Sequence, residues 1–122
     1  MEVVERRRKL RERVIEEASK WAGGLPFKVT AILIGSYARG DFNLWSDTDI
    51  VLVSEDFEGG PIRRLKALDI PPGFQVIPLT LKEFRRLLMR RNQLAVEVAS
   101  YGIVLRDDLG LSHRWLRRPF SH

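Results

Sequence analysis

The sequence has no cysteine, which excludes disulfide bonds and zinc sites that depend on thiolate ligands. It also has no apolar run near the roughly 20 residues that a membrane-spanning helix requires. The N-terminal segment 1–6 is charged and lacks the apolar stretch of a secretory signal peptide. The 122 residues are enough for one domain with one core, and 44% of them are hydrophobic, as in ordinary globular proteins. We therefore predict a single cytoplasmic domain over residues 1–122, with no membrane partner.

The net charge of +5 is distributed unevenly along the chain. Residues 21–79 carry five Lys or Arg against seven Asp or Glu, whereas residues 80–122 carry nine against four. A basic C-terminal third suits an acidic partner, such as a nucleic acid or a polyphosphate. An arginine-rich helix face in solvent explains the same charges, so both interpretations stay open.

The spacing of apolar residues predicts alternating helices and strands, which indicates an α/β fold. Thr80 and Glu83 have the form of a capping box, and Pro78 favours a sheet edge or a strand end. The basic segment 107–122, in which residues 113–119 have no clear period, is expected to form a mobile C-terminal tail. Helices are predicted at 3–22, 36–40 (one turn), 61–68, 81–88 and 93–100, and strands at 28–34, 49–53, 74–79 and 103–105. The first helix is expected to place on one face Val3, Leu10, Val14, Ala18 and Trp21.

A Gly-Ser pair, Gly35-Ser36, ends the first predicted strand and leads directly into a helical turn. Such a corner exposes backbone N–H groups; glycine lets a phosphate approach the backbone, and serine adds a hydroxyl donor. After ten intervening residues come Asp47 and Asp49, whose spacing at a strand start predicts that both side chains share one face. Two such carboxylates repel each other unless a cation lies between them, and hard oxygen ligands suit Mg²⁺. Each feature alone also fits an ordinary turn or a solvated strand end, but their combination is far more specific.

The segment from Gly35 through Ser36-Tyr37-Ala38-Arg39-Gly40, followed by Ser46-Asp47-Thr48-Asp49-Ile50, resembles the minimal nucleotidyltransferase family within the DNA polymerase beta superfamily. The resemblance implies a small mixed sheet flanked by helices, over roughly residues 3–106. It also implies that Gly35, Ser36 and Arg39 contact the triphosphate of ATP or another nucleoside triphosphate. Asp47 and Asp49 would be the catalytic carboxylates that coordinate Mg²⁺ while a hydroxyl attacks the α-phosphorus. For Arg39, a salt bridge to Asp41 or Asp47 is an equally good interpretation.

The sequence departs from the family pattern at the third carboxylate, because the equivalent strand position is occupied by Gln75. A glutamine can offer an amide oxygen to a metal but cannot take a proton from an attacking hydroxyl. The loss should therefore spare nucleotide binding more than turnover. A substitute carboxylate would have to come from Asp69, Glu97 or a partner chain, among which the sequence does not choose.

Minimal nucleotidyltransferases commonly pair with HEPN-domain proteins, so the resemblance implies a HEPN toxin as partner, with a tyrosine of that toxin as acceptor and an antitoxin role for this chain. Two alternatives stay open: a nucleotide-binding subunit with little or no transferase activity, and a nucleic-acid-binding module suggested only by charge. Trp45 and Trp115 are each expected either to pack in the fold or to contact a base or a partner.

Overall fold

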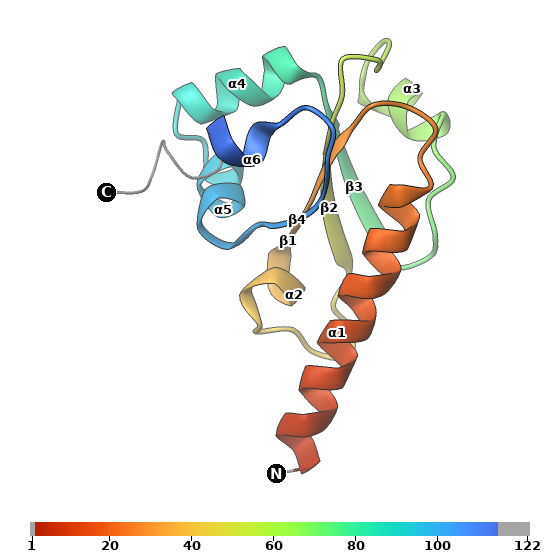
Figure 1. Cartoon of the computed structure of the whole chain (residues 1–122), viewed down its shortest axis with the longest axis vertical. Helices are drawn as coiled ribbons and strands as arrows, with labels where there is room; N and C mark the ends of the chain where they lie inside the picture. Colours follow the sequence, from red (N-terminus) through yellow and green to blue (C-terminus); the bar gives the residue numbers. More distant parts are fainter. Residues whose placement is uncertain (1, 115–122) are drawn as a thin grey trace.

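The computed structural model describes residues 2–114, which form a four-stranded sheet covered by helices on both faces (Figure 1). Helices and strands alternate nearly as the sequence predicts, and the mixed sheet flanked by helices is confirmed. None of the described helices is long and apolar enough to cross a membrane. The elements are α1 (Glu2–Gly23), β1 (Thr30–Ile34), α2 (Gly35–Arg39), β2 (Thr48–Val53), α3 (Pro61–Lys66), β3 (Phe74–Leu79), α4 (Leu81–Met89), α5 (Gln93–Tyr101), β4 (Ile103–Asp107) and α6 (Leu111–Arg114).

The strands lie in the order β3-β2-β1-β4. Strand β1 pairs antiparallel with both β2 and β4, whereas β2 pairs parallel with β3 after a crossover through α3. Because β3 is an edge strand, Pro78 costs the sheet no ladder hydrogen bond, as its position in the sequence predicts. The antiparallel β1–β2 pair brings the end of β1 beside the start of β2. The parallel β2–β3 pair brings the start of β3 to the same end of the sheet.

Alternate residues of the two central strands point to opposite faces of the sheet. One face packs against α1 and α2 and contains Ala31, Leu33, Ile50 and Leu52. The other face packs against α4, α5 and α6 and contains Ile32, Ile34, Val51 and Val53. Every residue of β1 is buried, because helices cover both faces. By this alternation Asp49 lies on the face that α5 covers, in line with Val51 and Val53.

Helix α1 packs on the sheet mainly through its C-terminal half. Ala18 is fully buried and Leu10, Val14 and Trp21 are partly buried, whereas Val3, placed on the same face by the sequence pattern, is 68% exposed. The first turns of the helix extend beyond the sheet (Figure 1), where Arg7 contacts the Phe42 ring and the Gly40 carbonyl but Val3 stays exposed. The helix is held to α2 by the Arg11 guanidinium, which donates to the backbone carbonyls of Tyr37 at 2.7 Å and Ala38 at 3.1 Å.

The folded domain extends further toward the C-terminus than the sequence predicts. Strand β4 runs to Asp107, whose carboxylate accepts hydrogen bonds from the backbone N–H of Leu111 at 2.8 Å and of Ser112 at 3.1 Å. Leu111 is only 2% exposed and packs in the core beside α4 and α5. Residues 107–112 are therefore part of the folded domain, which corrects the expected tail boundary at residue 107. Residues 115–122, with Trp115, lie outside the described part of the chain.

Candidate active site

The corner between β1 and α2 requires glycine at position 35. Gly35 has φ +78°, a left-handed conformation that side chains disfavour, and a Cβ built there would collide with the Oδ2 atom of Asp49 and lie 3.1 Å from its Cγ. The Asp49 carboxylate therefore lies directly against the backbone of the Gly35-Ser36 corner, with no side chain between them. Ser36 follows with a half-buried side chain. The sequence predicts the corner and the pair of aspartates separately, and the family resemblance implies that they face each other.

Strand pairing places two predicted site residues, Asp49 and Gln75, side by side, with Ile34, the neighbour of Gly35, on the other side of Asp49. Asp49 is the antiparallel partner of Ile34 and the parallel partner of Gln75. Gln75 therefore lies beside Asp49 on the α5-covered face, with an exposed side chain, at the position expected for the third carboxylate. Asp49 thus has the glycine-serine corner on its β1 side and a neutral amide on its β3 side.

At this end of the sheet, negative charges outnumber positive ones. Asp47 precedes β2 and is exposed, whereas Asp49 is partly buried. The pKa of Asp49 is raised, mainly by burial and then by the negative charges of Asp47 and Glu97; the positive charge of Arg39 opposes this effect. The site therefore carries an excess of negative charge, which a bound cation would relieve.

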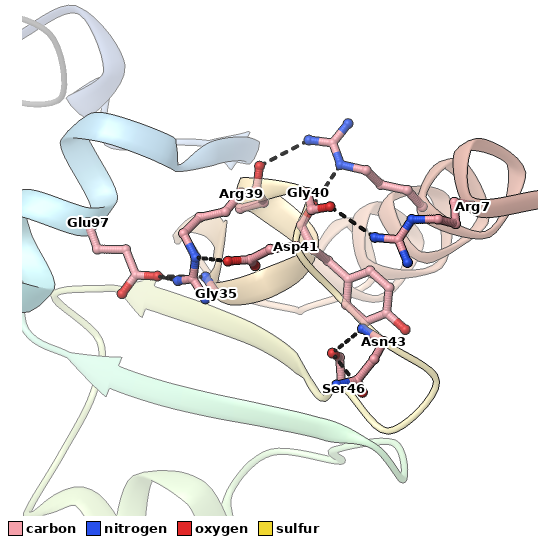
Figure 2. A network of polar contacts seen from close by, with 11 residues as sticks. Arg7, Gly35, Arg39, Gly40, Asp41, Asn43, Ser46 and Glu97 are labelled. Carbon is pink, nitrogen blue, oxygen red and sulfur yellow. Dashed lines mark hydrogen bonds and ion pairs between the residues drawn. The ribbon is translucent and has the colours of Figure 1, made fainter. Parts of the chain in front are cut away.

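A third carboxylate reaches the corner from helix α5, as Figure 2 shows. The Oε1 atom of Glu97 accepts a hydrogen bond from the backbone N–H of Gly35 at 3.1 Å and pairs with the Arg39 guanidinium. Arg39 also donates from Nε to Asp41 at 3.2 Å, so the predicted Arg39–Asp41 salt bridge is confirmed. Of the two substitute carboxylates that the sequence offered, only Glu97 lies at the site.

Asp69 lies elsewhere, in the segment between α3 and β3, where its backbone carbonyl accepts from the Trp21 indole N–H at 2.8 Å. It also lines a cavity of about 750 Å³ between the C-terminal end of α1 and α3, together with Trp21, Phe27 and Phe57. That cavity lies beside the loop that follows β2, whereas Asp49 lies at the start of the strand. The residues that line this cavity do not include Asp47 or Asp49, so the candidate site is identified by the chemistry of the corner and not by a large cavity.

The loop between α2 and β2 presents a tryptophan next to the carboxylates. Asn43 and Ser46 close a turn, since the backbone N–H of Asn43 donates to Ser46 Oγ at 2.9 Å (Figure 2). The backbone N–H of Trp45 donates to Asn43 Oδ1 at 2.8 Å. The turn leaves Leu44 and Trp45 84% and 90% exposed. Among residues 2–114, Trp45 therefore does not pack into the core.

The residues present fit a magnesium ion held jointly with a nucleotide. Within residues 2–114, no group of three Asp, Glu, His or Cys side chains could hold a metal without further ligands. Mg²⁺ typically takes one or two carboxylates and completes its shell with water and substrate phosphates. Asp47 and Asp49 can supply such a pair, and the missing side chain at Gly35 leaves room for the Asp49 carboxylate to lie against the backbone corner. The fit rests on hard oxygen ligands and on the excess of negative charge.

Fold and site together define a class: a small mixed-sheet domain in which a glycine-serine corner faces an Asp-x-Asp pair, as in polymerase beta-like nucleotidyltransferases. The chain belongs to the nucleotidyltransferase domain family, whose sequence profile matches residues 7–99. The matched segment includes the Gly35 corner, both aspartates, Gln75 and Glu97. The family membership predicted from the sequence is confirmed.

Two solved structures share the fold. One is a candidate nucleotidyltransferase from Sulfolobus solfataricus, with a TM-score of 0.53 and 20% identity, covering 85% of this chain and 86% of that one. The other belongs to a toxin–antitoxin complex solved with AMP-PNP, with a TM-score of 0.50 and 19% identity, covering 88% of this chain and 82% of that one. No curated protein matches the sequence significantly.

Proposed function

We propose that this protein binds a magnesium–nucleoside triphosphate, with ATP as the first candidate, and transfers the nucleoside monophosphate to an acceptor hydroxyl. The observation that carries the proposal is the Asp49 carboxylate lying directly against the Gly35 backbone, with Asp47 on the adjoining segment. A metal bound to the carboxylates and a phosphate bound to the corner would then be neighbours. That arrangement suits transfer from a triphosphate.

Each residue of the corner has a distinct role in this proposal. The N–H of Gly35, the Ser36 hydroxyl and the Arg39 guanidinium bind phosphate oxygens, while Asp47 and Asp49 hold Mg²⁺. When bound, the metal neutralises charge on the phosphates as the acceptor oxygen attacks the α-phosphorus and pyrophosphate leaves. Ser36 is a phosphate ligand in this scheme and not a nucleophile.

Gln75 favours a second candidate function, that of a nucleotide-binding subunit with weak transferase activity. Its neutral amide lies beside Asp49 and cannot accept the proton of the attacking hydroxyl. Positioned general bases contribute roughly 10²- to 10⁴-fold to rate, so turnover should suffer by a factor in this range. Nucleotide binding, which depends on the other side of Asp49, should be spared.

For the acceptor, we extend the proposal to a tyrosine of a HEPN-domain toxin partner. The fold shared with a component of a toxin–antitoxin complex solved with AMP-PNP supports this choice. So does the exposed pair Leu44 and Trp45 beside the carboxylates, because apolar side chains in solvent suit a protein acceptor better than a small polar one. The basic charge of residues 80–122 alone supports nucleic-acid binding, which remains the weaker candidate.

Isothermal calorimetry with ATP and Mg²⁺ tests the proposal directly. Wild-type protein should bind the nucleotide, and Asp49→Asn should weaken metal-dependent binding by about 10-fold or more. Asp69→Asn is the matched control, since it removes one carboxylate remote from the site and should leave binding unchanged. Absence of binding by wild type, with or without Mg²⁺, would reject the proposal. Transfer from α-labelled ATP to a co-purified protein then separates the enzyme from the binding subunit.

A further inference from the structure

Two of the donors that the proposed function assigns to phosphate, one a backbone N–H and one a guanidinium, already bind the same side chain. The Gly35 N–H donates to Glu97 Oε1 at 3.1 Å, and the Arg39 guanidinium pairs with the same oxygen. A carboxylate oxygen and a phosphate oxygen make the same kind of charge-assisted contact with such donors. Glu97 therefore sits where a phosphate oxygen would sit.

We propose that Glu97 is an internal competitor for the triphosphate, so that the nucleotide binds only by displacing the Glu97 side chain from Gly35 and Arg39. This inference rests on the proposed function, because it concerns the same phosphate corner. It adds a control on binding: affinity is set by the difference between the nucleotide's contacts and those that Glu97 gives up.

The position of Glu97 supports competition and does not support its use as a replacement for the missing third carboxylate. Helix α5 packs on β1 and α2, so Glu97 approaches from the β1 side of Asp49. Gln75, at the expected third-carboxylate position, lies on the β3 side. The two side chains thus flank Asp49 from opposite directions, and Glu97 stands on the phosphate side.

A purely structural ion pair accounts poorly for this contact. Arg39 already has a second carboxylate partner in Asp41, so it does not need Glu97 for neutralisation. Glu97 is also repelled by Asp49, whose pKa it helps to raise after the larger effect of burial and that of Asp47. Its side chain is 26% exposed, so part of it already reaches solvent. These features describe a contact that is easily exchanged for a better ligand.

Displacement of Glu97 would also remove a contact of helix α5, so this helix would respond to nucleotide binding. This helix packs against α4, and both contribute to the core on the same face of the sheet. The loss of the Glu97 contact would therefore first affect the packing of the helices on that face.

The test compares binding of Mg–ATP and of inorganic tripolyphosphate to wild type, Glu97→Gln and Glu97→Ala by calorimetry. Glutamine keeps the shape of the side chain but loses its charge, so both ligands should bind about 5- to 10-fold more tightly. Alanine removes the competitor and should act in the same direction. Asp41→Asn is the matched control: it removes another carboxylate from Arg39 but leaves the Gly35 N–H occupied, so affinity should change by less than about twofold.

The amide resonance of Gly35 in a ¹⁵N-labelled sample gives a second readout that does not depend on activity. It should shift in ligand-free Glu97→Gln, and added tripolyphosphate should shift it further in both proteins. Equal or weaker ligand binding by folded Glu97→Gln and Glu97→Ala, while wild type binds Mg–ATP, would overturn the competition and leave the proposed function standing. No binding by any of the proteins would overturn both.

Discussion

Two arginine–glutamate pairs at different places in the same domain show how differently its regions are built. Arg64 of α3 is buried and donates to Glu83 at 2.6 Å and to the backbone carbonyls of Gly59 at 2.9 Å and Pro78 at 3.0 Å. Glu83 also completes the predicted capping box of α4, which is confirmed. Hydrogen bonding from Arg64 and the Thr80 N–H lowers the pKa of Glu83. Every contact in this pair favours the charged, folded arrangement.

The pair formed by Arg39 and Glu97 lies among carboxylates and has the opposite character. Both side chains are partly exposed, and the nearby Asp49 has a raised pKa because of burial first and then its acidic neighbours. Folding alone gains little from such crowding of negative charge. The comparison indicates that the Arg64–Glu83 region is arranged for stability. The region around Asp49 keeps an excess of negative charge that a bound cation would neutralise.

The largest expected effect comes from adding a charge to the carboxylate-rich region. Gln75→Asp restores a proton acceptor beside Asp49, so transfer to a proven acceptor should accelerate by about 10²-fold or more. The same change adds a further negative charge and should lower the melting temperature. A rate equal to that of wild type would show that the missing base does not limit transfer, and Gln93→Asp, at the exposed start of α5, controls for net charge.

Next in size is the effect of filling the phosphate corner. Gly35→Ala should reduce Mg–ATP affinity by about 100-fold, and left-handed strain plus the collision with Asp49 should cost about 1–3 kcal/mol of stability. Gly40→Ala is the control, because Gly40 also has positive φ, at +97°, but its Cβ would meet nothing within 4 Å. It should lose stability only. Calorimetry and thermal unfolding measure the two quantities, and equal loss of affinity in both variants would contradict the assigned corner.

Charge removal should have opposite effects on stability in the two regions. Glu83→Gln should lower the free energy of unfolding by about 1–3 kcal/mol, because it weakens a capping box and leaves a buried arginine without its counterion, while ATP binding stays intact. Asp49→Asn should keep or slightly raise stability while metal-dependent binding is lost. Chemical denaturation of both variants checks the contrast, which fails if the signs agree.

The smallest expected effect is a difference in acid sensitivity. Because the pKa of Glu83 is lowered by folding, its stabilisation is present above its unfolded pKa of about 4.3 and is lost as the pH falls below that value. The pKa of Asp49 is raised, chiefly by burial, so protonation of Asp49 favours the folded state as the pH falls. Melting temperatures from pH 7 to pH 3 should therefore fall less steeply in Glu83→Gln than in wild type and more steeply in Asp49→Asn.

Local chemistry in the sequence was enough to predict most of the fold. Strand Phe74–Leu79 and the capping box at Thr80 appear as predicted, because alternation and cap residues act over a few neighbours. The Gly35 corner follows from the same kind of local pattern, because it depends on where a strand ends. The position of Gln75 was inferred from the family resemblance, and the parallel pairing of β2 with β3 places it beside Asp49.

Tertiary packing alone decided the remaining features. Val3 lies on the predicted apolar face of α1 but is exposed, because the helix extends beyond the sheet that it covers. Asp107 holds the C-terminal segment through contacts that no period in the sequence predicts. The choice of Glu97 over Asp69 depends on how α5 lies across β1, which brings groups 62 residues apart into hydrogen-bonding distance. Periodicity specifies which face of an element is apolar, but only the packed domain determines which distant side chain reaches the site.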